Sequence, residues 1–397
     1  SRPELATIGT ARLNGIQGVA ERGARAGFGP YEGVIQGELV QAALAQRFNA
    51  GHLWSPSQLE SYATCPFRFF SEHLLKLEPL SELALRGDAR RRGSLLHQVL
   101  ATIHQQLSRA AAPLEAHFAD VELVEHFLAA LDATVRRAPL RGIEQSLREI
   151  ERREIESWAP KYAEQESIYR QQWEHLDQSP TPAYFEVRFG PDIRTRGDDL
   201  ADPASTAVPF ELDLGDEQIR LTGQIDRVDI GRVGQVTVFN IIDYKSGKRE
   251  VKLNLDKVRS GHQLQLPLYA LATEQLLLAD QKAVALATSY WNIQGRGFGK
   301  AKGGSLHLRE LTEQTLRISK DWQDLQPDLL RRVQELISGI RGGQFPVYNE
   351  DDQCTRSCSL STVCHVAQVR SLEKIWPPPE DQGEQREEHR AGSGDGE

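Results

Sequence analysis

The chain has 397 residues, of which 39% are hydrophobic and 7% aromatic, and its formal net charge is −9. No apolar run approaches the roughly 18 residues of a membrane span, and no segment resembles a signal peptide, so we expect a cytoplasmic protein. Seven acidic and two basic side chains after residue 379 supply −5 of the charge, so the mildly acidic remainder does not exclude nucleic acid as a partner.

Composition divides the chain into three parts. We expect residues 1–50 to be the tail of a preceding domain, 51–377 to form the main domain, and the Gly- and Glu-rich residues 378–397 to be a disordered acidic tail. No methionine occurs, even at position 1, which indicates a fragment of a longer polypeptide.

The first half of the main domain is predicted to be helical. Ser55 is the expected N-cap of a helix that leads to Cys65, because Pro56 and Gln58 suit its first turn. Apolar residues at helical spacing predict a second helix over 90–107, which begins with the basic residues Arg90, Arg91 and Arg92 and carries His97. Residues 108–175 form a predicted helical insertion, with helices over 121–135 and 144–165.

The second half is predicted to contain the sheet. Strands are expected over 183–189, 208–214, 218–230, 241–245 and 283–291, with helices over 260–278 and 311–341. Glu186 lies on the first of these strands, where we expect it to face solvent. Pro267 must fall in the first turn of its helix or kink it.

Three charged residues on neighbouring strands form a candidate metal site. Asp243 and Lys245 lie two apart at the end of an apolar strand and therefore project to the same face, while Asp226 lies on the preceding strand. A hairpin centred near residues 232–233 would place Asp226 opposite Phe239, about 13 Å from Asp243. We therefore expect a bulge that brings the two carboxylates together; without one, Asp226 is not a ligand.

Three further groups of residues suit ligand binding. Gln265 and Tyr269 lie four apart on one helix face, and the Gly/Lys-rich loop 295–304, with Lys300, could contact phosphates although it lacks the order of a nucleotide P-loop. Cys65, Cys354, Cys358 and Cys364 are expected to bind a metal, because three of them cluster in a polar stretch. Their chemistry suits either zinc or an iron–sulfur cluster.

Four ordered motifs resemble those of the PD-(D/E)xK nucleases of the RecB/AddB type. They are Gly93 to His97, Asp226, Asp243-Tyr244-Lys245, and Gln265 to Tyr269. The resemblance implies an α/β restriction-endonuclease-like core, a mixed sheet flanked by helices, which hydrolyses phosphodiester bonds of DNA. It also implies that residues 1–50 follow a helicase-like domain.

The resemblance also implies roles for individual residues. Asp226, Asp243, the backbone carbonyl of Tyr244 and His97 would hold Mg²⁺ or Mn²⁺. Lys245 would orient or deprotonate the attacking water, and deprotonation requires a pKa lowered by burial. Gln265 and Tyr269 would position the DNA strand or the lysine, and Arg90, Arg91, Arg92 and Lys300 are weaker candidates for DNA contacts.

For the cysteines, the resemblance implies a [4Fe-4S] cluster held by Cys65, Cys354, Cys358 and Cys364, which would link the two ends of the domain. Three residues separate Cys354 from Cys358, where the family usually has two. The implied partner is an AddA-like helicase–nuclease subunit, and the implied substrate is single-stranded DNA at an unwound end during double-strand break repair.

Three alternatives remain open. A stand-alone iron–sulfur exonuclease of the CRISPR-adaptation type shares these motifs. A non-catalytic module would use the same fold to bind DNA and to scaffold a helicase, without hydrolysing DNA. A structural protein would use the same cysteines to bind a stabilising Zn²⁺ ion.

Overall fold

The computed structural model divides the chain into two compact units. The larger unit comprises Arg47–Ala63 and Leu80–Ser338, and the smaller unit comprises Ser1–Gln46, Thr64–Pro79 and Gly339–Glu397. The structure describes residues 3–24, 27–78, 89–110, 120–137, 143–191, 202–299, 304–312, 315–356, 358–364, 366–370, 372–374 and 376. Within these ranges no helix has both the length and the apolar character that crossing a membrane requires.

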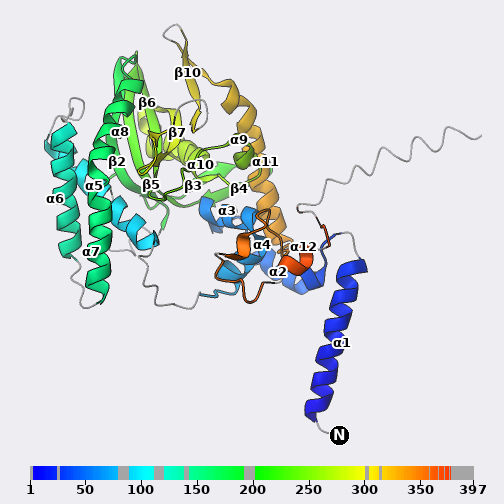
Figure 1. Cartoon of the computed structure of the whole chain (residues 1–397). Helices are drawn as coiled ribbons and strands as arrows, with labels where there is room; N and C mark the ends of the chain where they lie inside the picture. Colours follow the sequence, from blue (N-terminus) through cyan, green and yellow to red (C-terminus); the bar gives the residue numbers. More distant parts are fainter. Residues whose placement is uncertain are drawn as a thin grey trace, which may run out of the picture. The chain divides into compact units, whose positions relative to one another are not determined.

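A mixed six-stranded sheet forms the centre of the larger unit (Figure 1). Its order is β2-β5-β6-β7-β8, with β9 also paired to β7; β6 and β7 are parallel, and the other neighbours are antiparallel. The strands are β2 (Gln178–Phe189), β5 (Gly223–Val233), β6 (Val236–Lys245), β7 (Val284–Asn292), β8 (Gly297–Phe298) and β9 (Ser305–His307). This architecture confirms the predicted α/β fold class.

Four helices form a layer on one face of this sheet (Figure 1). They are α5 (Ala89–Ala110), α6 (Asp120–Arg137), α7 (Ile143–Glu156) and α8 (Ala159–Gln172). Helices α5 and α8 contact the strands, and α6 and α7 pack against other helices of the layer. Their common core includes Val238, Ile242 and Tyr244 of β6, which alternate along the strand with residues of the other face. The single helix predicted over 144–165 is wrong, because the chain breaks between α7 and α8 and Pro160 occupies the first turn of α8.

The β6–β7 crossover carries the predicted glutamine–tyrosine helix. It contains α9 (Leu255–Arg259) and α10 (Gln265–Ala272), which packs against β6 and β7 and continues into a π-helical turn, Thr273–Leu277. Since α10 begins at Gln265, Pro267 lies in its first turn, as the sequence predicted. The α-helix is shorter than the predicted 260–278, because residues 260–264 lie in the turn before α10 and the chain after Ala272 continues as the π-helical turn.

Smaller elements complete the larger unit. A three-stranded sheet has the order β1-β4-β3, and β10 pairs with β11. The predicted helix over 311–341 is wrong in its first part, which forms β10 and β11 before α11 begins. The bounds are β1 (Leu53–Trp54), α3 (Pro56–Thr64), β3 (Phe210–Asp213), β4 (Gln218–Leu221), β10 (Arg309–Thr312), β11 (Thr315–Ile318) and α11 (Lys320–Arg341).

The predicted cap of α3 is confirmed. The backbone N–H of Gln58 donates to the Ser55 hydroxyl at 3.2 Å, and the Ser55 N–H donates to the Gln58 side-chain oxygen at 3.2 Å. These reciprocal bonds satisfy backbone donors at the helix start and fix the point where the chain enters α3.

The smaller unit joins three segments that are distant in the sequence. The Phe345 ring lies 6.2 Å from Phe69 and 5.2 Å from Phe70, and the buried Lys374 ammonium contacts Glu32 at 2.7 Å. Residues 1–46 thus share this unit with the cysteine segments, and their assignment to a preceding domain stays a prediction. Its helices are α1 (Pro3–Ala24), α2 (Glu38–Arg47), α4 (Pro66–Phe69) and α12 (Val366–Arg370), with a π-helical turn at Phe70–Leu74.

Candidate active site

The β5–β6 hairpin brings Asp226 and Asp243 to the same rung. Its register pairs Arg227 with Ile242, and Val233 with Val236. Continuing this register by one residue places Asp226 opposite Asp243. The predicted hairpin centre was wrong by about two residues, because the turn lies at residues 234–235, where Gly234 supplies a φ of +57°. The expected bulge is therefore not needed between these strands, whose register is unbroken.

Asp226 forms a three-residue cluster with His97 and Glu186. Its Oδ1 lies 3.3 Å from His97 Nδ1, and Glu186 Oε1 lies 3.6 Å from the same nitrogen. Ligand atoms of His97, Glu186 and Asp226 all lie within 4.8 Å of one another, an arrangement that could hold one metal ion. The structure thus brings the predicted His97 and Asp226 together with a third donor.

Glu186 is the site residue that the sequence analysis missed. It is 8% exposed instead of facing solvent, and its φ of +52° is one of few positive values among the non-glycine residues described. The register places Glu186 beside Asp226, with Phe185 paired to Arg227 and Val187 to Ile225. Left-handed backbone is costly for a residue with a Cβ, and such strain is concentrated at functional sites. The sequence signal that could have found it is a Glu with apolar neighbours on both sides.

Opposing charges set the protonation states of this cluster. Burial alone would lower the pKa of His97, but the carboxylates of Asp226 and Glu186 raise it well above its ordinary value. Burial alone would raise the pKa of Asp226, but His97 and Lys245 lower it. Burial raises the pKa of Glu186, which shares the imidazole with Asp226. The charged imidazole of His97 therefore balances the Asp226 carboxylate in this buried site, at a place where a bound cation could provide the same balance.

Asp243 and Lys245 project to the same face, as predicted, and the structure shows that they form an ion pair. Burial raises the pKa of Asp243 despite this partner. For Lys245, burial alone would lower the pKa, but Asp243 raises it above the ordinary value. The ammonium also lies 5.1 Å from the centre of the Tyr290 ring. The lowered pKa that general-base catalysis by Lys245 requires is thus not found, and its charged form is favoured.

Helix α10 supplies Gln265 and Tyr269 to the same site. The Gln265 side chain hydrogen-bonds the Tyr269 hydroxyl, which also accepts the backbone N–H of Gln224 at 3.4 Å. Gly223 allows this approach, because a Cβ there would lie 2.5 Å from the Tyr269 ring. Glu60 of α3 accepts the N–H groups of Leu264 and Gln265 at 2.6 and 2.9 Å and so anchors the start of α10.

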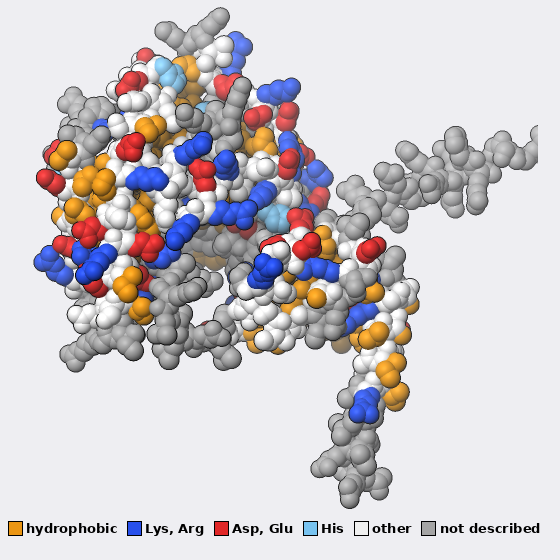
Figure 2. All heavy atoms as spheres, viewed as in Figure 1, with side chains coloured by type: hydrophobic (Ala, Val, Ile, Leu, Met, Phe, Trp, Pro, Cys, Tyr) orange, Lys and Arg blue, Asp and Glu red, His pale blue; other side chains and the backbone are white. Residues whose placement is uncertain are grey.

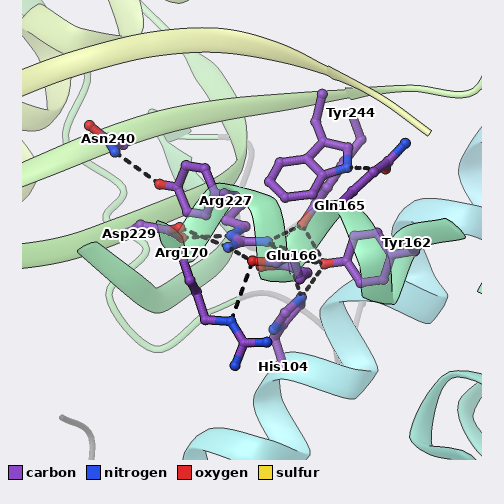
Figure 3. Close-up of polar contacts among 11 residues, drawn as sticks. His104, Tyr162, Gln165, Glu166, Arg170, Arg227, Asp229, Asn240 and Tyr244 are labelled. Carbon is purple, nitrogen blue, oxygen red and sulfur yellow. Dashed lines mark hydrogen bonds and ion pairs between the residues drawn. The ribbon is translucent and has the colours of Figure 1, made fainter. Parts of the chain in front are cut away.

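A buried ionic network supports the opposite face of the same strands. Arg227, which follows Asp226, is fully buried and pairs with Glu166 of α8 and with Asp229, whose Oδ1 lies 2.6 Å from its Nε. Figure 3 shows these groups meeting Tyr162, Tyr244 and His104. Arg227 Nη1 donates to the Tyr244 hydroxyl at 3.1 Å. The network thereby ties the residues adjacent to Asp226 and Asp243 to the helical layer.

The four cysteines lie in the smaller unit, and all are partly exposed. Burial and then the other three thiols raise the pKa of Cys65 to about 11, which shows that the thiols are close enough to interact. Arg370 Nη2 donates to Cys354 Sγ at 3.3 Å. A raised pKa opposes a nucleophilic role, because the thiolate is the reactive form. Four interacting thiols from two chain segments are a donor set that fits a metal or an iron–sulfur cluster.

Two of the predicted DNA-binding arginines contact the helical insertion. Arg91 Nη2 lies 2.9 Å from Glu151 and Arg92 Nη1 lies 3.1 Å from Glu154, so both pair with α7. The side chain of Arg90 and all of Lys300 lie outside the described residues. DNA contacts by these four residues stay predictions.

Comparisons with known proteins agree with this geometry. The family model described as the PD-(D/E)XK nuclease superfamily matches residues 53–365. Among curated relatives, an ATP-dependent helicase/deoxyribonuclease subunit from Staphylococcus saprophyticus is 28% identical over 220 residues, which is 54% of this chain and 17% of the relative. The protein of the same name from Clostridium kluyveri is 28% identical over 256 residues, which is 63% of this chain and 20% of the relative. The protein of that name from Staphylococcus aureus is 25% identical over 295 residues, which is 72% of this chain and 22% of the relative. The chain thus spans about a fifth of the length of these relatives.

Proposed function

Because the chain belongs to the PD-(D/E)XK nuclease superfamily, we propose that this site hydrolyses phosphodiester bonds of DNA with the help of a divalent metal ion. The observation that carries the proposal is the convergence of His97, Glu186 and Asp226 within 4.8 Å, beside the Asp243–Lys245 pair. Buried charged groups are costly, and clusters of them with shifted pKa values are concentrated at functional sites.

The donor set fits Mg²⁺ or Mn²⁺. Asp226, Asp243 and Glu186 offer carboxylate oxygens, the ligand type that Mg²⁺ and Mn²⁺ prefer, and His97 offers an imidazole nitrogen as one further donor. We assign the Tyr244 backbone carbonyl as a further ligand on the family pattern. When bound, the metal would supply a water of lowered pKa and offset negative charge on the phosphate.

Side chains of the protein would orient the attacking water and the DNA by their position and charge. Lys245, kept protonated by Asp243, would donate to the attacking water or to a phosphate oxygen and so orient the reaction. Gln265 and Tyr269 would hold the DNA strand and the lysine in place, since α10 anchors both to the site.

We propose single-stranded DNA at an unwound end as the substrate and an AddA-like helicase–nuclease subunit as the partner, in repair of double-strand breaks in the cytoplasm. The names of the relatives, which describe a subunit of an ATP-dependent helicase/deoxyribonuclease, support this proposal. On the face drawn in Figure 2, Lys and Arg side chains gather in a band across the larger unit, although the whole chain is acidic. Such a local patch provides the electrostatic contact that a DNA backbone needs.

We also propose that Cys65, Cys354, Cys358 and Cys364 hold a [4Fe-4S] cluster. Cys65 and the three C-terminal cysteines are separated by nearly 290 residues, yet they interact within one unit. A cluster here would close a very long loop of the unfolded chain and stabilise the smaller unit. Zinc in the purified protein would contradict the cluster.

The test is digestion of end-labelled single-stranded DNA without ATP, by anaerobically purified protein in Mg²⁺, Mn²⁺ or EDTA. We expect metal-dependent cleavage that is lost in Asp243→Asn, a variant of almost unchanged size. The label that is released first gives the polarity. A folded wild-type protein that binds the DNA but cuts none of it would contradict the proposal and favour the non-catalytic scaffold.

A further inference from the structure

A polar cavity of about 390 Å³ lies beside the proposed metal site. Its walls come from the start of α3, the end of β2, the start of β5 and Tyr269 of α10. Most of the residues that line it carry a polar side chain: Ser55, Ser57, Gln58, Arg188, Thr222, Gln224 and Tyr269. A cavity of this size lies at the lower end of the range that binds small molecules and suits one nucleotide, not a duplex.

Arg188 gives the cavity its charge. Among the described residues that line the cavity, it alone is charged, and it is only 8% exposed. Its Nε donates to Gln224 Oε1 at 3.0 Å, which fixes the plane of the guanidinium group. A guanidinium group oriented in this way favours binding of a phosphate, because two of its N–H groups can donate to phosphate oxygens in parallel.

The strand register fixes the distance from Arg188 to the metal site. Arg188 pairs with Gln224 across β2 and β5, and the Glu186–Asp226 rung lies two residues along both strands. Two residues along a strand span about 6.6 Å and return to the same face. This spacing is close to that of successive phosphates along a nucleic acid strand. Gln224 links the two rungs directly, because its amide also donates to Glu186.

We propose that this cavity binds the nucleotide next to the cleaved linkage and that Arg188 contacts the phosphate of that nucleotide. The inference rests on the proposed nuclease function. Since Arg188 lies two residues along β2 from Glu186 of the metal site, it holds the DNA strand in register while taking no part in the bond-breaking step. Arg188 is thus a substrate-binding residue, and Gln224 positions both Arg188 and Glu186.

The test uses a single-stranded oligonucleotide with one uncharged methylphosphonate linkage near its middle, and compares cutting at each linkage with cutting of the unmodified strand. In wild-type protein we expect slower cutting at the modified linkage and, in addition, about tenfold slower cutting at one neighbouring linkage, because the contact between Arg188 and that phosphate is lost. In Arg188→Gln the effect at the neighbour should disappear while the effect at the modified linkage stays.

Two variants serve as controls. Arg188→Lys keeps the charge and should keep part of the effect at the neighbour, whereas Arg317→Gln removes one exposed charge on β11 and should behave as wild type. Each comparison is made between linkages on the same protein, so partial misfolding does not alter it. The inference is overturned if the neighbour is unaffected in wild type or equally affected in Arg188→Gln.

A failure of the nuclease proposal would look different, because wild type would then cut no linkage. Binding of the unmodified oligonucleotide in Ca²⁺ tests the cavity in that case. About tenfold weaker binding by Arg188→Gln than by Arg317→Gln would support a phosphate site, and equal binding would overturn it.

Discussion

The Tyr244 backbone N–H donates a hydrogen bond of 2.8 Å to Asp226 Oδ2, across the rung that also carries Asp243. Asp226 therefore has two functions: one oxygen fixes the end of β6, and the other faces His97. The structural function needs only an oxygen acceptor, whereas the proposed metal-binding function needs the charge. Substitutions of Asp226 can separate these functions.

Asp226→Asn should lower the cleavage rate at least about 100-fold, because loss of even the outer partners of a metal site costs about 10–100-fold. The Asn side-chain oxygen can still accept the Tyr244 N–H. Asp226→Ala should be equally inactive and less stable than Asp226→Asn by about 1–3 kcal/mol, because a buried N–H is left unpaired. Cleavage assays and urea unfolding measure the two effects. Equal stability of the two variants would contradict the structural function of the hydrogen bond.

At position 186, the Glu186→Gly variant should be more stable than the Glu186→Ala variant. Glu186→Ala and Glu186→Gly both remove the carboxylate, but only glycine relieves the left-handed backbone at φ +52°. We expect the free energy of unfolding of Glu186→Gly to be about 1 kcal/mol higher than that of Glu186→Ala. Both should lose metal-dependent cleavage. If the glycine variant is the less stable one, the backbone strain at this position is not real.

Glu60 should make stability depend on pH. Burial raises its pKa from an ordinary 4.5 to about 7, although the N–H groups of Gln265 and Leu264 oppose the rise. A raised carboxyl pKa stabilises the folded state fully below about pH 4.5, and this contribution is lost as the pH rises through about 7. The loss is at most about 3–4 kcal/mol, because a tenfold change in proton affinity between the unfolded and folded states corresponds to about 1.36 kcal/mol.

The matched variant for this effect is Glu60→Gln, which can still accept an N–H of α10 but cannot ionise. Urea midpoints measured from pH 4.5 to 8 should fall more steeply for wild type than for Glu60→Gln. Parallel curves would show that Glu60 titrates normally and does not contribute to the pH dependence.

Arg227 should be among the most costly residues to replace. Arg227→Leu leaves the buried carboxylates of Glu166 and Asp229 without their cation, which should destabilise the protein by about 3–5 kcal/mol. Arg153→Gln breaks an exposed pair with Glu149 and should cost less than about 1 kcal/mol. Thermal unfolding compares the two, and similar small losses in both variants would mean that the buried network is dispensable.

Removal of the proposed cluster should weaken the smaller unit. Cys65→Ala should lose bound iron and melt several degrees lower than wild type, because the link between Cys65 and the C-terminal cysteines no longer holds the segments together. Iron content and thermal melting of anaerobically purified protein measure this. Loss of iron with unchanged melting would contradict the structural role.

The sequence determined the elements whose signals are local. Ser55 and Gln58 specify the start of α3, and Pro267 lies in the first turn of α10, because caps and prolines act within one helical turn. The pairing of Asp243 with Lys245 on one strand face follows from the two-residue period of a strand. These residues, with Asp226 and His97, were predicted members of the site, and the structure brings them together.

Only the tertiary structure decided which residues of different segments meet. The hairpin register depends on where the turn forms, and Gly234 places it about two residues beyond the predicted centre, so Asp226 faces Asp243 without a bulge. Glu186 reaches the site because β2 pairs with β5, and that pairing joins residues about 40 positions apart, beyond the reach of any local pattern. Strands β10 and β11 pair where the sequence predicted the first part of a helix over 311–341, because local propensity is weak and tertiary context routinely overrides it. Local sequence specifies the elements, whereas the site is assembled by long-range pairing of strands.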